Sequence, residues 1–182
     1  FIRQSEPGKQ IDFRKYTQPV IDFLSSKGVD AKFEGKNDLK VNGLKISGNA
    51  EHVHRSRVLH HGTLLFEASL DSLRNTIRKD TSCYSTRAVD SNPSSVANLK
   101  GMLSETYDIF WFREEMMNYF LANLPETEVY NLNSKDIDEA DALAESKYRT
   151  WEWNYAYGPE YRFANKFEFR GEQAECMLLV QE

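Results

Sequence analysis

The dipeptide Asn42-Gly43 restricts the fold of this 182-residue chain more than any other feature, because both residues tolerate the positive φ angles of a two-residue hairpin turn. Short apolar segments flank the dipeptide, at residues 39–41 and at residues 44–47. The sequence therefore predicts an antiparallel β-hairpin over these residues. A further short strand is expected just before the hairpin, at residues 29–33.

Helical periodicity is clearest in two segments. Apolar residues recur at helical spacing over residues 11–27, where Gly28 is the expected stop and Pro19 is expected to kink or divide the helix. Residues 109–124 carry an apolar stripe on one face, with Asp108 as the expected N-cap. This second segment is predicted to be a core helix.

The rest of the chain mixes strands, polar helices and a loop. A short helix is expected to begin near Asp71, and an acidic helix is expected over residues 135–149. Trp151, Trp153 and Tyr155 would share one face if their segment were extended, and packing is their expected role. Further strands are expected at residues 62–68, 163–169 and 174–180, and a long loop at residues 83–99. With no internal repeat or linker, the pattern predicts one α/β or α+β domain with a largely antiparallel or mixed sheet.

Charge and cysteine usage exclude several classes of protein. The net charge of −5 is spread along the sequence without a run of Lys or Arg, so no nucleic-acid partner is expected. No apolar stretch approaches the roughly 20 residues that a membrane-spanning helix needs, so no membrane is expected either. The two cysteines, Cys83 and Cys176, lie far apart and outside any CxxC spacing, which favours a reducing, cytoplasmic setting over a disulfide framework.

Lys45 is a candidate for chemistry because it lies between two glycine-containing turns. Glycine lets backbone approach a ligand closely, and a lone ammonium offers a mobile point charge to a phosphate or a developing oxyanion. The same alternation also fits a plain strand, in which Leu44 and Ile46 face the core and Lys45 faces solvent. Periodicity alone favours this second interpretation.

The four histidines all lie between positions 52 and 61. His52 and His54 have strand spacing and could share a face, as two ligands of a metal ion would. Apart from the nearby Glu51, no acidic residue or cysteine completes an obvious ligand set. Histidines that are exposed, or satisfied by neighbouring groups, are therefore favoured over metal ligands.

Five motifs, in this order and spacing, together resemble the lipoate–protein ligase A family. They are GKNDL at 35–39, GLKISGNA at 43–50, HHGTLLF at 60–66, SSVANL at 94–99 and WEWNY at 151–155. The resemblance extends over nearly the whole chain, and GLKISGNA followed by HHGTLL is its most specific part. It implies the biotin and lipoate ligase fold, a mixed sheet flanked by helices.

The resemblance also implies a site. In that family the lysine of the second motif contacts the carboxyl region of lipoate and the nucleotide phosphate, and the matching residue is Lys45, the expected catalytic residue. The other residues expected to bind ATP or lipoate are Asn37, Asp38, Gly48, Asn49, His61 and Gly62. His61 and Gly62 are expected to shape the pocket, and no metal ligand on the protein is expected.

The implied reaction has two steps. Lipoate attacks the α-phosphate of ATP to give lipoyl-adenylate and pyrophosphate, and a carrier lysine then takes the lipoyl group as an amide. Mg²⁺ is expected to offset the triphosphate charge. The implied carriers are the lipoyl domains of 2-oxoacid dehydrogenase complexes and the H protein of glycine cleavage.

Two departures from the family pattern qualify the resemblance. The arginine- and glycine-rich motif that normally precedes this region is absent, so residues 1–182 are expected to be a catalytic domain lacking that motif and any C-terminal accessory domain. Such a chain alone is expected to be inactive. In addition, the loop at residues 91–99 lacks the two arginines that are usual in the family, which puts its nucleotide role in doubt.

Two alternative functions stay open. An octanoyl or lipoyl amidotransferase of the same fold would transfer the acyl group through a cysteine thioester without ATP, but neither Cys83 nor Cys176 occupies an expected nucleophile position. A catalytically silent module that binds lipoate or a carrier domain is favoured by the missing glycine motif and arginines.

Overall fold

The computed structural model describes residues 2–3, 12–77, 82–86, 94–105, 107–125 and 127–181. The chain forms two compact units. The first comprises residues 1–76 and 93–128, and the second comprises residues 77–92 and 129–182. No helix within the described ranges has the length and apolar character needed to cross a membrane.

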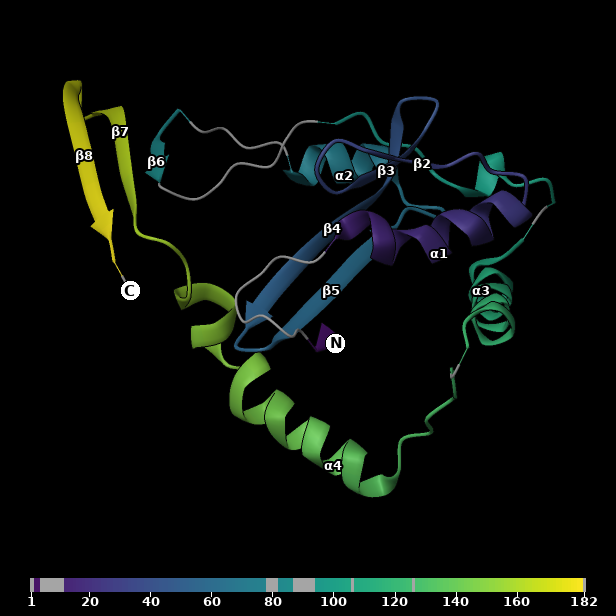
Figure 1. The fold of residues 1–182 in the computed structure, drawn as a ribbon. Coiled ribbons are helices and arrows are strands. Elements are labelled where there is room, and N and C mark those ends of the chain that lie inside the picture. The colour runs from purple at the N-terminus through teal and green to yellow at the C-terminus, as the bar shows by residue number, and fades with distance from the viewer. Residues whose placement is uncertain are drawn as a thin grey trace. The chain divides into compact units, whose positions relative to one another are not determined.

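The first unit contains a five-stranded sheet in the order β1-β5-β4-β3-β2, in which every neighbouring pair is antiparallel (Figure 1). Its strands are β1 (Ile2–Arg3), β2 (Lys32–Glu34), β3 (Asp38–Val41), β4 (Leu44–His54) and β5 (Arg57–Leu64). Its helices are α1 (Phe13–Ser26), α2 (Leu70–Ile77), of which residue 77 falls in the second unit, and α3 (Ile109–Asn123). A parallel bridge between Lys45 and Val96 makes the arrangement mixed, as the sequence predicts.

The central hairpin is confirmed. Asn42 and Gly43 have φ angles of 51° and 77°, the left-handed values that the two-residue turn requires. The following strand is longer than expected, because β4 continues to His54 and a second tight turn at Arg55, with φ 55°, leads into β5. Arginine rarely adopts positive φ, so this turn could not be predicted from the residue type.

Helix α1 is capped at both ends. The Asp12 carboxylate accepts a hydrogen bond from the Arg14 backbone N–H at 2.9 Å and caps the start. At the other end, Gly28 takes a φ of 82°, and the Val29 N–H donates to the Leu24 carbonyl at 2.9 Å, which forms a Schellman motif. Gly28 is therefore the expected stop. Pro19 lies inside α1 without dividing it.

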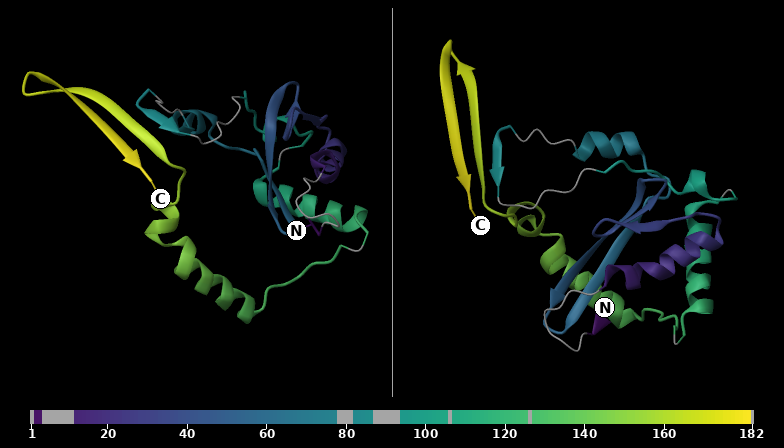
Figure 2. Two further views of the ribbon diagram at one scale, coloured as in Figure 1. Left: turned by 60° about the vertical axis from the view of Figure 1, so that its left-hand side comes forward. Right: turned by 45° about the horizontal axis from the view of Figure 1, so that its top comes forward.

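The second unit contains a separate three-stranded antiparallel sheet, in the order β6-β7-β8 (Figure 2). The strands are β6 (Tyr84–Thr86), β7 (Tyr161–Phe169) and β8 (Glu172–Val180), joined in the last pair by a tight turn with positive φ at Arg170 and Gly171. Strand β6 lies where the sequence predicted a loop, and residues 87–93 of that loop lie outside the described residues. The acidic helix α4 (Ser134–Leu143) begins with a capping box between Asn133 and Asp136.

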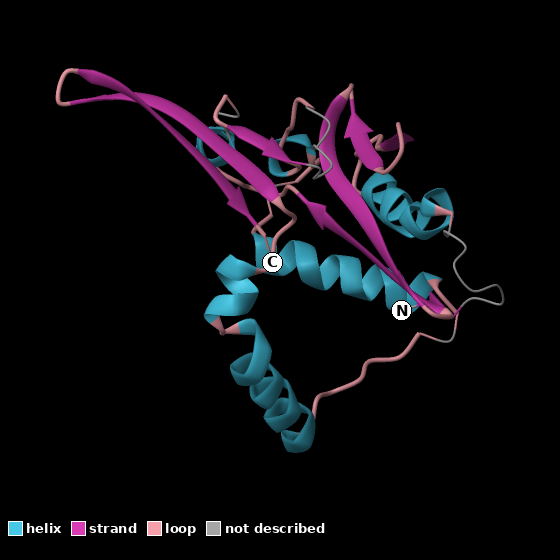
Figure 3. Ribbon diagram, turned by 90° about the vertical axis from the view of Figure 1, so that its left-hand side faces the viewer, coloured by secondary structure: helices cyan, strands magenta, loops and turns pink. Residues whose placement is uncertain are grey.

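The aromatic segment after α4 is helical rather than extended, so the condition under which Trp151, Trp153 and Tyr155 would share one face is not met (Figure 3). Wide turns at Ala144–Tyr148 and Glu152–Ala156 are closed by bonds between residues five apart, such as Tyr157 N–H to the Glu152 carbonyl at 2.9 Å. Trp151 and Tyr155 now meet through helical spacing, with ring centroids 6.2 Å apart. The i, i+4 contact replaces the alternation that an extended strand would give.

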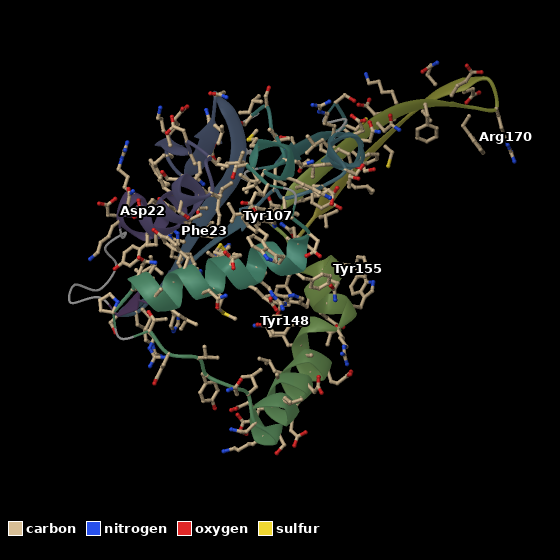
Figure 4. All side chains as sticks on the ribbon, turned by 90° about the vertical axis from the view of Figure 1, so that its right-hand side faces the viewer. Asp22, Phe23, Tyr107, Tyr148, Tyr155 and Arg170 are labelled. Atoms are coloured by element: carbon tan, nitrogen blue, oxygen red, sulfur yellow. The ribbon has the colours of Figure 1, made fainter. Side chains whose placement is uncertain are left out.

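The core of the first unit lies between α1, α3 and one face of the sheet. Phe23, which is labelled in Figure 4, is fully buried. Its ring centroid lies 5.4 Å from that of Phe112 and 5.5 Å from that of Tyr119. Leu39 and Ile46 complete this core from β3 and β4. Each large apolar side chain buried in this way contributes about 1.5–3 kcal/mol, which fixes the sheet against the helices. The opposite face of the sheet does not take part in this core, and it carries the candidate site described below.

Candidate active site

A β-bulge places the candidate lysine. The β3–β4 register pairs Asp38 with Gly48, Leu39 with Ser47, Lys40 with Lys45, and Val41 with Leu44. Ile46 has no partner in this ladder, and Ile46 and Ser47 are both buried, at 0% and 3% exposure, although they are consecutive. Two successive residues facing one side are the mark of a bulge, which re-aims the side chains beyond it.

The consequence is that Lys45 lies on the same face as Asp38. Residues paired across two neighbouring strands share a face of the sheet. The Asp38–Gly48 pair and the Lys40–Lys45 pair therefore both point away from the core. We call this surface the open face of the sheet; across β5 it continues with Thr63 and His61, which pair with Gly48 and Ala50.

On the open face, the Lys45 ammonium Nζ lies 2.7 Å from Asp38 Oδ1. Both side chains are partly shielded, with 27% and 18% of their surfaces exposed. Gly48 makes this arrangement possible, because a Cβ at that position would lie only 3.0 Å from Lys45 Cε and 3.1 Å from Nζ. The ammonium is thus fixed over bare backbone, with its charge directed along the open face.

The SSVANL segment lies beside Lys45. The Lys45 N–H donates to the Ser95 carbonyl at 2.8 Å, and the Ala97 N–H donates to the Lys45 carbonyl at 3.0 Å. The Asn98 side chain is held by both backbone groups of Ala68, at 2.8 and 2.9 Å. Residue-level reasoning missed Ser95 and Ala97 as neighbours of Lys45, since only the position of their motif among the others signalled it.

The other three expected site residues are Asn49, Gly62 and Asn37, and they do not lie on the open face. Asn49 pairs with Gly62, and Asn49 is 8% exposed on the core side of the sheet, where its amide Nδ2 donates to the Asn37 carbonyl at 3.0 Å. A Cβ at Gly62 would lie 2.2 Å from Asn49 Oδ1, so this close approach requires glycine. Asn37 belongs to the turn just before Asp38.

The histidines divide between the two faces. His61 is exposed on the open face, whereas His60 points to the other side, with Nδ1 3.4 Å from Glu51 Oε1 and its ring 5.3 Å from Phe13. His52 and His54 are exposed. Among the residues that the structure describes, no three His, Cys, Asp or Glu side chains are grouped closely enough to hold a metal ion.

Of the seven expected site residues, the open face brings together Lys45, Asp38, Gly48 and His61. Their binding roles stay predictions. A lysine ammonium that is fixed over glycine backbone on a sheet face can offer its charge to an anionic ligand.

The chain belongs to the family of the lipoyl protein ligase A/B catalytic domain, whose sequence model matches residues 1–121. Lipoate–protein ligase 1 of Staphylococcus aureus is 32% identical over 169 residues, which cover 93% of this chain and 51% of that protein. The chain thus spans about half the length of this relative. The extent of the ligase domain over residues 1–182 stays a prediction.

Two solved structures share the fold. A bipartite lipoate protein ligase of Thermoplasma acidophilum, described with its E2 lipoyl domain, has a TM-score of 0.58 and 24% identity, and 81% of this chain and 60% of that chain are covered. A lipoate–protein ligase A bound with ATP has a TM-score of 0.60 and 24% identity, with coverage of 81% and 61%. The expected biotin and lipoate ligase fold, of mixed α+β class, is therefore confirmed.

Proposed function

We propose that the protein to which this chain belongs is an ATP-dependent lipoate–protein ligase. The observation that carries the proposal is the placement of Lys45 on the open face, 2.7 Å from Asp38 and directly over Gly48. The family membership and the name of the S. aureus relative support the choice of lipoate as the substrate. The ATP-bound structure of the same fold supports the choice of nucleotide.

The proposed chemistry needs a fixed positive charge in both steps. In the first step a lipoate carboxylate oxygen attacks the α-phosphorus of ATP, and pyrophosphate leaves as the new P–O bond forms. In the second step a carrier lysine attacks the lipoyl carbonyl carbon, the amide forms and AMP leaves. The Lys45 ammonium would lie beside the phosphate and the carbonyl oxygen, where it stabilises the charge that develops on each.

Asp38 has a defined part in this proposal. Its carboxylate holds the ammonium in place before substrates bind. The rotamer freedom that a lysine side chain loses when it is fixed is therefore lost before the reaction begins. An incoming phosphate then adds a second anion to a charge that is already oriented, and little reorganisation is left for the reaction itself. We expect Gly48 and the exposed His61 to border the same ligand.

We propose Mg²⁺ as the counter-ion of the triphosphate. The described residues provide only Asp38 as a carboxylate beside Lys45, so the ion would be carried mainly by phosphate oxygens and water. This fits the ordinary behaviour of Mg²⁺, which keeps several waters and uses one or two carboxylates in nucleotide sites.

The proposed partners are the lipoyl domains of 2-oxoacid dehydrogenase complexes and the H protein of glycine cleavage. The first is supported by the Thermoplasma structure, which is described with its E2 lipoyl domain. We propose a cytoplasmic location, because Cys83 and Cys176 are both free thiols, as in a reducing compartment.

The rival thioester mechanism can be separated from this proposal by its nucleophile. Cys83 belongs to the second unit and lies near Asn165, with Sγ 3.7 Å from Oδ1, and its described neighbours include no base that would activate it. We expect Cys83→Ser and Cys176→Ser variants of the intact protein to retain ATP-dependent lipoylation of a carrier domain. Loss of activity in either variant, with folding intact, would favour the amidotransferase.

The direct test is to incubate the intact protein with ATP and labelled lipoate and to follow lipoyl-adenylate and pyrophosphate. Formation of both is expected only with ATP present. A protein that binds lipoate without forming either product would be the silent binding module instead.

A further inference from the structure

Two asparagines join the turn before β3 to the middle of β4. The Asn37 Nδ2 donates to the Asn49 carbonyl, while the Asn37 carbonyl accepts both the Asn49 backbone N–H at 2.9 Å and its side-chain Nδ2 at 3.0 Å. The same Nδ2 lies 3.4 Å from the buried Ser47 Oγ. The bonds are reciprocal, and they orient the Asn49 amide, because exchange of its oxygen and nitrogen would set two oxygens against each other.

The asparagine clasp, defined by Asn37 and Asn49, ends one residue before Asp38. Asn49 lies on the core side at 8% exposure, and its side-chain amide donates hydrogen bonds within the protein. It is therefore poorly placed to touch a ligand on the open face. The clasp instead fixes the backbone that leads into Asp38, whose carboxylate in turn holds Lys45.

We propose that Asn49 is a positioning residue that sets the Asp38–Lys45 pair from the far side of the sheet. The inference rests on the proposed role of Lys45, and it replaces the expectation that Asn49 binds ATP or lipoate directly. Gly62 belongs to the same device, because the Asn49 side chain occupies the space that any side chain at position 62 would need.

The experiment uses the intact enzyme with Asn49→Ala and Gly62→Ala. The first removes the amide, and the second drives a Cβ to 2.2 Å from Asn49 Oδ1 and so displaces the amide without touching the open face. Thr17→Ala is the matched control. Thr17 is also buried in the first unit, at 2% exposure, and its hydroxyl donates to the Phe13 carbonyl at 2.8 Å, far along the chain from the clasp.

Two readouts separate positioning from structure. The first is kcat and KM for lipoyl-adenylate formation, measured where each variant is fully folded by circular dichroism. The second is the ¹³C and ¹⁵N signal of the Lys45 side chain in lysine-labelled protein, assigned by its loss in Lys45→Arg. Loss of an electrostatic donor itself is expected to lower kcat by about 10²–10³-fold. Both variants should lower kcat by less than this, with little change in KM. Both should also shift the Lys45 signal.

Coupling provides a further check. Once Asn49→Ala has removed the nearest clashing atoms, Gly62→Ala should lower kcat by a smaller factor than it does alone, because only the contact of its Cβ with the Gly48 carbonyl, at 3.2 Å, remains. Thr17→Ala should leave both kcat and the Lys45 signal unchanged while it lowers the midpoint of thermal unfolding.

Several outcomes would overturn the inference. An unshifted Lys45 signal in Asn49→Ala with unchanged kcat would reduce Asn49 to a structural residue. An unshifted signal with a raised KM would make it a direct ligand contact. Failure of the proposed function is distinct, because wild-type protein would then form no lipoyl-adenylate, while the Lys45 signal would still report whether Asn49 sets the ion pair.

Discussion

Removal of the Lys45 ammonium should separate catalysis from stability by a wide margin. An isolated, partly exposed ion pair such as Lys45–Asp38 contributes about 1 kcal/mol or less to folding. Loss of a fixed electrostatic donor to a developing charge costs about 2.7–4 kcal/mol, or about 10²–10³ in rate. Since a domain has about 5–15 kcal/mol of stability, Lys45→Ala should remain folded and still lose most of its activity.

The assay measures the two half-reactions separately in the intact enzyme. Adenylation is followed from ATP and lipoate, and transfer is followed from presynthesised lipoyl-adenylate to a carrier domain. Lys45→Ala should impair both, because the proposed charge serves the phosphate in one step and the carbonyl oxygen in the other. Lys45→Arg should restore activity only in part, since a bulkier, planar guanidinium must fit over Gly48, where the ammonium already makes close contact.

Lys40→Ala is the matched control. Lys40 lies directly opposite Lys45 on the same face, has 24% of its side chain exposed, and forms its own ion pair with Glu34 at 3.4 Å. Its variant loses the same charge from the same strand pair and should keep nearly normal rates. Equal losses in the Lys40 and Lys45 variants, or near-normal rates in Lys45→Ala, would refute the proposed role.

Three further perturbations follow from the geometry. Gly48→Ala should lower activity with little loss of stability, because its Cβ displaces only the flexible end of Lys45, as kinetics and urea unfolding would show. Gly28→Ala should destabilise the protein by about 1–2 kcal/mol in urea unfolding, because alanine at a φ of 82° is strained. The Asn133 N–H, together with the Tyr130 hydroxyl, lowers the pKa of Asp136 below its ordinary 3.8, so its stabilisation is present above that pH and lost as pH falls through the lowered value. Helix content by circular dichroism should therefore fall on acidification below about pH 4 more steeply than in Asp136→Asn.

Features set by local chemistry could be predicted from the sequence. Asn42 and Gly43 determine their turn through their own φ preferences, and the Asp108 carboxylate caps α3 by accepting the Trp111 N–H at 2.7 Å. Helix α3 accordingly begins at the expected residue and ends one residue from the expected end. In each case the decisive interaction lies within a few residues of chain.

Features set by distant partners could not be predicted. Strand β6 has three residues and exists only because Tyr84 pairs with Phe163 across almost 80 positions of sequence. The turn at Arg55 likewise depends on the register between β4 and β5, since arginine has no preference for positive φ. The conformational propensities of Tyr84 and Arg55 themselves therefore predict neither the strand nor the turn.

The sequence motifs indicate which residues belong to the candidate site, but only the structure shows which face of the sheet each one occupies. The motifs placed Lys45, Asp38, Gly48 and Asn49 in one set, because they are close in sequence. The alternation of β4 then divides them, leaving Asn49 on the core side and the other three on the open face. A sequence motif marks residues that act together, but it does not distinguish those that touch a ligand from those that position them.

The bulge in β4 follows from two demands that one regular ladder cannot meet. A two-residue turn at residues 42–43 pairs Val41 with Leu44, whereas the core pairs Leu39 with Ser47, so Ile46 is left without a partner between the Lys40–Lys45 and Leu39–Ser47 pairs. If the pairing from Ser47 ran on regularly, Lys45 would lie opposite Val41, which is 7% exposed on the core side. An unpaired buried ammonium costs several kcal/mol, against about 0.5–1.5 kcal/mol for each ladder hydrogen bond that a bulge disrupts. The irregular register is therefore the cheaper solution, and it is also the one that carries the charge of Lys45 to the open face beside Asp38.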